Sequence, residues 1–205
     1  MEMGYGGGRM IMNIKMLWFD TETTGLDPIL NDIIQISGQI TINGQVMEEF
    51  NMKCQPTNWD NIQQGALDIN KITIEQLKTY PQPELVYNKL LKMFKKYVNP
   101  FDKTDKFVAA GQNVKFDIDM TQQFFKKHND PYFFSFIHAG HFDTLHIAIM
   151  LEIKEKRKIF TKGYKLSQMC EALGIKLEDA HDALNDIRAT RELAKVMWNR
   201  LTKYK

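Results

Sequence analysis

An apolar run that ends in two closely spaced carboxylates constrains the fold of this chain more than any other feature. Residues 16–19 (Met-Leu-Trp-Phe) are typical of a buried strand, and Asp20 and Glu22 follow them directly. Side chains in a strand alternate between its two faces, so both carboxylates should point the same way. Like charges held this close repel each other unless a cation lies between them, and Mg²⁺ or Mn²⁺ takes oxygen ligands of this kind. The motif therefore predicts a metal site at the end of a strand.

The remaining pattern predicts one α/β domain with a mixed sheet. After a first strand at 15–19, two strands at 33–42 and 46–54 flank Asn43-Gly44, which is a strong hairpin signal. A short apolar strand is expected at 107–110. An apolar stripe at helical spacing predicts a helix that ends before Pro100. The residues of this stripe are Leu85, Leu90, Leu91, Phe94 and Val98. Further helices are expected at 117–127, 141–151, 165–173 and 182–201.

Length and composition narrow the class of protein. A chain of 205 residues suits a single domain, which we place at 14–205 after a glycine-rich flexible leader at 1–13. The net charge of +2 neither requires nor excludes a nucleic-acid partner. Cys54 and Cys170 lie far apart and in no metal-ligand spacing, which favours two reduced thiols. Since no apolar segment is long enough to span a bilayer, we expect a cytoplasmic protein without a membrane partner.

Two later motifs carry further acids and one imidazole. The segment 111–117 follows a predicted strand and opens a helix, so Asp117 lies in a first helical turn. The segment that opens the last helix contains His181 and, five residues later, Asp186. That offset would place the two side chains on different faces of a helix, so we expect His181 on the preceding loop. There it can reach a water that is bound by the metal at Asp186.

These motifs together resemble those of the DnaQ-like 3′→5′ exonucleases of the DEDDh type. The resemblance covers residues 15–201 and follows the family's order of motifs. It rests on residues 20–26 (Asp-Thr-Glu-Thr-Thr-Gly-Leu), on 113–117, and on His181 with Asp186. Several motifs at suitable distances are far more specific than any one of them. The implied fold is RNase H-like, which is an α/β fold with a five-stranded mixed sheet flanked by helices.

The resemblance also implies roles for individual residues. The ligands of two divalent metals, Mg²⁺ or Mn²⁺, would be Asp20, Glu22, Asp117 and Asp186. His181 would be the general base, since an imidazole of ordinary pKa, about 6.5, accepts a proton at neutral pH. Glu22 and the backbone of Thr23 would recognise the terminal 3′-hydroxyl, and Leu26 would wedge against the last base. Phe116 would pack near that base, and Asn113 would also contact substrate.

Simpler readings of single residues remain open from the sequence. Asp117 could be only a helix N-terminal charge, and Leu26 and Phe116 could be core side chains. Asp143 fits a helix cap better than a metal ligand. A basic run could follow a phosphate backbone or could equally be a solvated loop, and it comprises Lys154, Lys156, Arg157, Lys158, Lys162 and Lys165.

We therefore expect a two-metal exonuclease that releases nucleoside monophosphates from the 3′ end of single-stranded DNA. The nearest alternative is an exoribonuclease similar to RNase T or oligoribonuclease, because contacts to a 2′-hydroxyl cannot be read from the motifs. Another alternative is a proofreading or accessory subunit of a DNA polymerase; since the chain stops at Lys205, directly after the last predicted helix, a free-standing nuclease is favoured. Many relatives carry His where Gln112 stands, which puts one substrate contact in doubt but leaves the predicted ligands intact.

Overall fold

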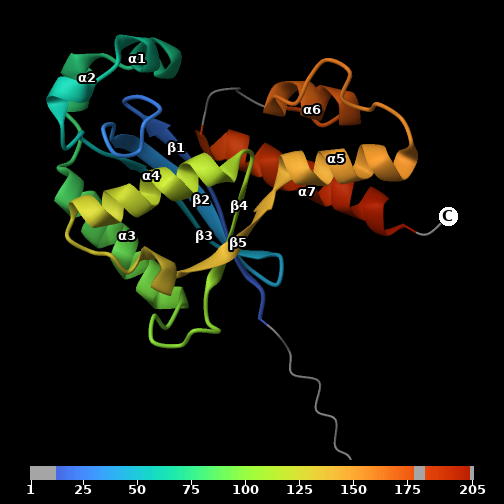
Figure 1. The fold of residues 1–205 in the computed structure, drawn as a ribbon, viewed down its shortest axis with the longest axis horizontal. Coiled ribbons are helices and arrows are strands. Elements are labelled where there is room, and N and C mark those ends of the chain that lie inside the picture. The colour runs from blue at the N-terminus through green and yellow to red at the C-terminus, as the bar shows by residue number, and fades with distance from the viewer. Residues whose placement is uncertain (1–12, 178–182, 204–205) are drawn as a thin grey trace, which may run out of the picture.

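The computed structural model describes residues 13–177 and 183–203, and these form a five-stranded mixed sheet with helices on both faces (Figure 1). The strand order is β3-β2-β1-β4-β5. Strands β1 (Lys15–Thr23), β2 (Ile33–Ile42) and β3 (Gln45–Lys53) form an antiparallel meander, whereas β4 (Phe107–Gly111) and β5 (Ile137–Asp143) run parallel to β1. The carboxyl ends of β1, β4 and β5 therefore meet at one edge of the sheet.

The hairpin between β2 and β3 confirms the turn predicted from Asn43-Gly44. Both residues have positive φ values, 51° for Asn43 and 83° for Gly44. This backbone twist matches the twist of the flanking strands, which is why asparagine followed by glycine is favoured here. The hairpin places β2 between β1 and β3, so the central strand β1 is buried between β2 and β4.

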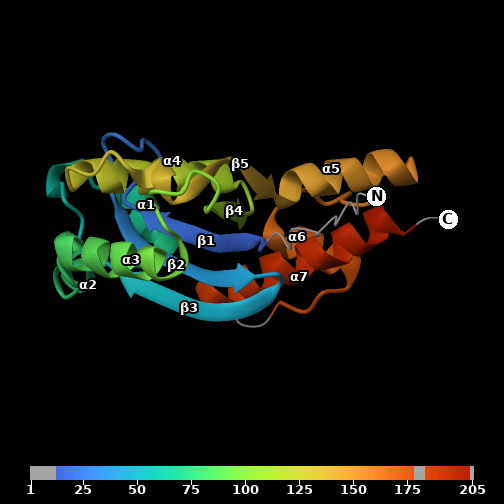
Figure 2. The ribbon, with the colours of Figure 1, turned by 90° about the horizontal axis from the view of Figure 1, so that it is seen from below.

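Alternating residues of β1 divide the interior into two cores. Leu17 and Phe19 pack with the helices α3 (Pro83–Tyr97) and α4 (Val114–Lys127), whereas Trp18 packs on the opposite face. The opposite face is covered by α5 (Thr144–Glu155), α6 (Leu166–Leu173) and α7 (Ala183–Thr202), as Figure 2 shows. Both faces of β1 are thus buried, and its carboxyl end is held firmly in place.

A smaller apolar cluster supports the segment between β3 and α3. It joins the buried Ile34 to the short helices α1 (Gln64–Asn70) and α2 (Ile74–Lys78). A short 3₁₀ helix, η1 (Trp59–Asn61), precedes them, and a second, η2 (Phe133–Ser135), precedes β5. The start of α2 has a capping box between Thr73 and Gln76, which fixes where this helix begins.

The structure corrects several predicted elements. Residues 141–143 belong to strand β5 rather than to the start of a helix, and α4 begins at Val114 rather than at Asp117. Leu85 is 57% exposed, because the buried stripe of α3 runs through Val86, Leu90 and Phe94 instead. The predicted leader lies outside the described residues, apart from Asn13. None of the described helices combines the length and hydrophobicity that a bilayer span requires.

Candidate active site

The carboxyl end of β1 presents the first two predicted site residues. Asp20 and Glu22 are two positions apart in the strand, and both are partly buried. The ladder with β2 shifts register between Glu22 and Thr23, so the strand ends in an irregularity directly after the two acids. Such irregularities redirect side chains at strand ends. The two carboxylates therefore lie at the sheet edge where β4 and β5 also end.

Asp117 reaches the same place from the first turn of α4. Its Oδ1 accepts hydrogen bonds from the backbone N of Thr21 at 2.8 Å and from the Thr21 hydroxyl at 2.7 Å. Only 3% of Asp117 is exposed, and this burial raises its pKa to about 7, although the two bonds from Thr21 oppose the shift and Glu22 adds to it. The buried bonds to β1 show that Asp117 is more than a charge at a helix end.

Electrostatics connects all four predicted acids. The pKa of Asp20 lies well above its usual range because burial disfavours its charged form, and because Asp117, Glu22 and Asp186 each add a repelling charge. Asp186 comes from the first turn of α7. Strand β1, helix α4 and helix α7 thus bring their carboxylates close enough for each to oppose the ionisation of Asp20.

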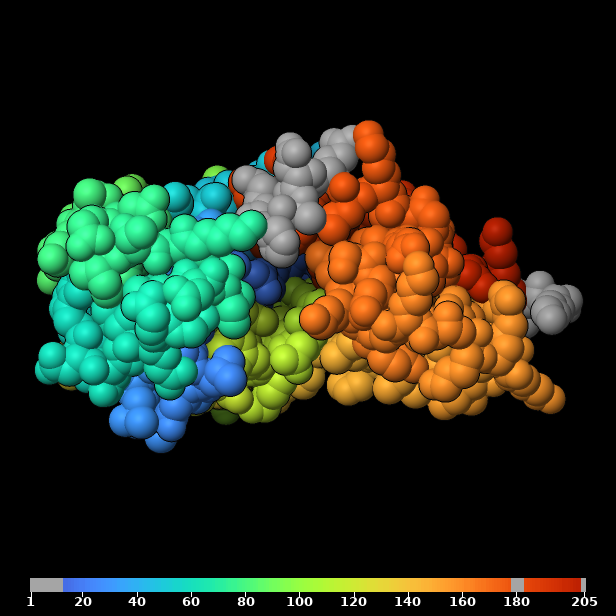
Figure 3. All heavy atoms as spheres, turned by 90° about the horizontal axis from the view of Figure 1, so that it is seen from above, coloured from blue at the N-terminus to red at the C-terminus, as the bar shows by residue number. Residues whose placement is uncertain are grey.

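A cavity opens beside these acids. Its volume is about 290 Å³, and its lining includes Asp20, Asp186, Gln112 and Lys165. In the space-filling view the surface is hollowed between the teal helices α1 and α2 and the orange helix α6, with the dark blue atoms of β1 at the bottom (Figure 3). Of the four predicted acids, Asp20 and Asp186 therefore line this cavity.

The donor set fits hard divalent cations. Carboxylate oxygens are the ligands that such ions take, and a dication would relieve the repulsion that raises the pKa of Asp20. Across residues 13–177 and 183–203, no three His, Cys, Asp or Glu side chains already stand in a metal-binding arrangement. The predicted base, His181, lies outside the described residues, as does Asp182.

The four predicted substrate contacts lie on two neighbouring elements. Thr23 is buried at the end of β1, and its hydroxyl donates to the carbonyl of Gly25 at 2.7 Å. Leu26 follows on the loop and is 79% exposed, which excludes a core role. Asn113 is exposed, and Phe116 is only partly buried on the first turn of α4. Leu26 and Phe116 therefore both keep surface that a ligand can reach.

Two polar residues beside the predicted ligands organise the site, and of these the sequence singled out only Asp143. Thr21 fixes Asp117, as described above. Asp143 caps α5 through the N of Leu145 at 2.9 Å, and it also accepts from the N of Asn113 and of Val114, both at 3.1 Å. Asp143 therefore holds the start of two helices, and its expected role as a cap is confirmed.

Gln112, where many DEDDh relatives carry histidine, has a structural place. Its side-chain amide donates to the carbonyl of Tyr164, and its Oε1 accepts from the hydroxyl of Thr144 at 3.2 Å. These bonds connect the end of β4 to the segment that precedes α6. Gln112 thus shapes one wall of the cavity that contains Asp20 and Asp186.

The basic run between α5 and α6 is mostly committed to contacts within the chain. Lys154 donates to the carbonyls of Arg200, Leu201 and Lys203 at the end of α7, at 2.6–2.8 Å. Three other members pair with glutamates: Arg157 with Glu155, Lys158 with Glu152, and Lys162 with Glu171. These contacts favour a solvated loop over a run of free cations that follows a phosphate backbone. Lys165 differs from the other members, because it lines the cavity.

Comparison with known proteins gives the family. The model of the RNase T exonuclease family matches residues 17–194, which is most of the chain. The chain belongs to this exonuclease family. The residues that the family model matches contain Asp20, Glu22, Asp117 and Asp186.

Curated relatives and solved structures agree with this assignment. The chain is 26% identical over 179 residues to a DNA polymerase III of the PolC type from Pediococcus pentosaceus, and 26% identical over 186 residues to its counterpart from Thermotoga petrophila. These matches cover 87% and 88% of the chain but only 11% and 12% of the polymerases. The chain thus spans about a tenth of the length of these relatives.

The fold is that of exonuclease I. A complex of exonuclease I from E. coli with a dT13 oligonucleotide matches with a TM-score of 0.70 at 24% identity, covering 91% of this chain and 41% of that one. A zinc-bound complex of the same enzyme with single-stranded DNA matches with a TM-score of 0.74 at 24% identity, covering 92% and 41%. The predicted five-stranded RNase H-like fold is confirmed.

Proposed function

We propose that this domain removes nucleoside monophosphates from the 3′ end of single-stranded DNA with the help of two divalent ions. The observation that carries the proposal is the convergence of Asp20, Glu22, Asp117 and Asp186, whose repulsion raises the pKa of Asp20. The matched exonuclease I structures hold single-stranded DNA oligonucleotides, which supports DNA as the substrate.

The four acids would hold the ions, Mg²⁺ or Mn²⁺, and His181 would act as the base. When bound, such ions stabilise the charge that develops on the attacking and leaving oxygens of an in-line displacement. His181 would accept the proton of the attacking water, because a carboxylate committed to a cation is a poor base. Thr21 keeps one oxygen of Asp117 fixed by two hydrogen bonds, which leaves Oδ2 for the ion.

The end of the DNA strand would lie between the loop after β1 and the first turn of α4. Glu22 and the backbone of Thr23 would bind the 3′-hydroxyl. The exposed Leu26 would wedge against the terminal base, with Phe116 and Asn113 on the other side. Apolar contacts of this kind accept any base, so we expect little sequence preference.

Matched oligonucleotides test the proposal. With Mg²⁺, the purified chain should shorten a 5′-labelled DNA strand from its 3′ end, and a 3′-phosphate in place of the hydroxyl should protect the strand. A chelator should stop the reaction. Faster digestion of an RNA strand of the same sequence would instead favour an exoribonuclease. Release of the 5′ label from the strand with the 3′-phosphate would contradict the proposed polarity.

The similarity to DNA polymerases supports a second candidate function, in which the same reaction serves proofreading. A proofreading nuclease acts on primer ends that fray from the template. It should therefore degrade a primer with a mismatched 3′ terminus several-fold faster than a fully paired primer. Equal rates on both primers, with rapid digestion of free single strands, would favour a nuclease that works alone.

The stability of the metal-free protein should fall as the pH rises from about 5 to 8. Because the pKa of Asp117 is raised to about 7 and that of Asp20 is also raised, the folded state binds more protons than the unfolded state over this range. Mg²⁺ should offset the repulsion, so its stabilising effect should be larger at pH 8 than at pH 5.5. Each kcal/mol corresponds to about 2–4 °C in melting temperature for a domain of this size. Thermal melts with and without Mg²⁺ at both pH values measure the stabilisation. If Mg²⁺ raised the melting temperature equally at pH 5.5 and pH 8, the prediction would be contradicted.

A further inference from the structure

The loop that carries Leu26, residues 24–32, buries little apolar surface of its own. Leu26, Ile29 and Leu30 are 79%, 70% and 53% exposed. A groove of about 540 Å³ separates residues 26–29 from Asp119, Gln122 and Gln123 on α4. Since apolar packing against α4 does not set the position of this loop, polar contacts must do so.

A ladder of hydrogen bonds closes the base of the loop. The backbone N of Thr24 donates to the carbonyl of Asp32 at 2.9 Å, and the N of Asp32 donates to the Thr24 hydroxyl at 2.9 Å. Within the loop, the side chain of Asn31 accepts from the N of Asp27 at 3.0 Å and donates to the carbonyl of Asn61 at 2.7 Å. These contacts make the loop a compact unit, but they do not join it to α4.

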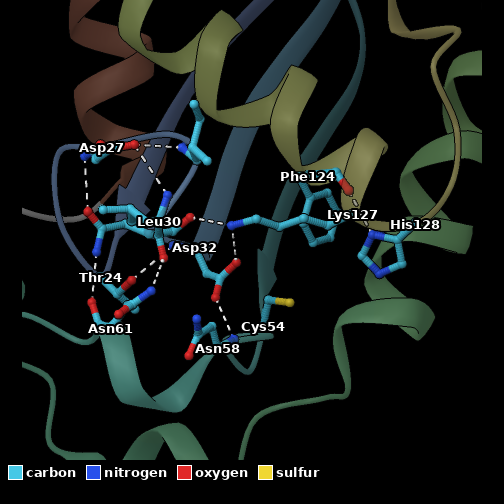
Figure 4. A network of polar contacts seen from close by, with 12 residues as sticks. Thr24, Asp27, Leu30, Asp32, Cys54, Asn58, Asn61, Phe124, Lys127 and His128 are labelled. Carbon is cyan, nitrogen blue, oxygen red and sulfur yellow. Dashed lines mark hydrogen bonds and ion pairs between the residues drawn. The ribbon is translucent and has the colours of Figure 1, made fainter.

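Lys127, the last residue of α4, makes that connection. Its Nζ lies 2.7 Å from Oδ1 of Asp32 and donates to the carbonyl of Asn31 at 2.6 Å (Figure 4). The side chain of Asp32 is only 2% exposed and that of Lys127 is 22% exposed. The other oxygen of Asp32 accepts from the N of Asn58 at 2.7 Å. A buried carboxylate thus ties the base of the loop to α4 and to the segment before α1.

We infer that the Lys127–Asp32 ion pair is a positioning device for the 3′-terminal nucleotide, an inference that rests on the proposed function. Helix α4 carries Phe116 on its first turn, and the loop carries Leu26. The pair fixes the loop against the same helix, and so it sets the spacing between the two side chains that would hold the terminal base. Loss of the pair removes the link between the loop and α4, while the carboxylates of β1 and α4 stay in place.

The test compares two DNA strands that differ only at the 3′ end. One ends in thymidine and the other ends in an abasic deoxyribose with a free 3′-hydroxyl, which cannot contact Leu26. In Lys127→Met, the KM for the thymidine end should rise about tenfold with kcat within about twofold, because one partner of a buried pair is lost. On the abasic end, kcat/KM should change by less than about twofold. Leu26→Ala should give the same contrast.

Three matched variants keep the result interpretable. Lys127→Arg retains the charge and should restore the KM to within about threefold of the parent value. Asp32→Asn keeps an acceptor for the N of Asn58 but loses the charge, and it should behave as Lys127→Met does. Lys96→Met removes an exposed lysine that pairs with Glu48 elsewhere on the surface, and it should change neither strand's digestion. If Lys127→Met lost kcat/KM equally on the thymidine and abasic ends, or lost none on either, the inference would be overturned.

Hydrogen exchange separates this inference from the proposed function. In Lys127→Met, the amides of residues 24–32 should exchange at least about tenfold faster, while those of β3 should be unchanged. Unchanged exchange in the loop of an active Lys127→Met protein would overturn the positioning role alone. A parent protein that releases nucleotides from neither strand would overturn the proposed function.

Discussion

Asp20→Asn should lower nuclease turnover by at least about a thousandfold and should also stabilise the metal-free protein. The two effects have one cause. Asp20 is disfavoured as an anion by burial and by the charges of Asp117, Glu22 and Asp186, so a neutral amide of the same shape removes that repulsion. The same change removes a carboxylate that a divalent ion would need.

Digestion of a labelled single strand measures the first effect, and thermal melts in chelator measure the second. Glu171→Gln is the matched control, because Glu171 is an exposed acid of α6 that pairs with Lys162. This control should leave the rate within about twofold of the parent value. If Asp20→Asn digested DNA at the parent rate, the first motif would have no part in the chemistry. If it lowered the melting temperature in chelator, Asp20 would have a structural role instead.

His181→Ala should lower kcat by about 10²–10⁴-fold, which is the usual contribution of a general base. Affinity for the divalent ion should remain nearly unchanged, because the four proposed ligands are carboxylates. The parent rate should rise with pH, since only the neutral imidazole accepts a proton. The variant should lose that rise.

Steady-state kinetics from pH 5.5 to 8.5 and calorimetric titration of Mn²⁺ check these expectations. His138→Ala removes an exposed histidine at the start of β5, and its pH profile should match that of the parent. Added imidazole should restore part of the activity of His181→Ala. A His181→Ala protein that kept the parent profile would show that another group accepts the proton.

The meander and the first motif could be read from the sequence because their signals are local. The turn at Asn43-Gly44 sets its own backbone geometry, and the alternation of β1 places Asp20 and Glu22 two positions apart on the strand. The end of α6 was predicted correctly for the same reason, since capping residues act within a few positions. Local rules thus gave most of the element order.

Strand β5 could not be recognised because its stability comes from its neighbour. Its sequence (Ile-His-Ala-Gly-His-Phe-Asp) lacks strong alternation, and it forms a strand because β4 offers a ladder on that side. The buried face of α3 was misplaced in part for a similar reason. Leu85 and Val86 fit a helix equally well, and only the position of the sheet decides which one is buried.

The polar contacts that shape the site were equally hidden. Thr21 and Asp117 are 96 positions apart in the sequence, and Lys127 and Asp32 are 95 positions apart. No spacing rule links such pairs, because the fold alone brings them together. The motifs therefore identified the acids, whereas the partners that orient Asp117 and the Leu26 loop required the structure.

The cavity beside the acids is lined by Asp20 from the first strand and by Asp186 from the last helix. Its walls therefore cannot form until α7 has been synthesised. A nascent chain that ends before α7 lacks the cavity in which the proposed cleavage would take place.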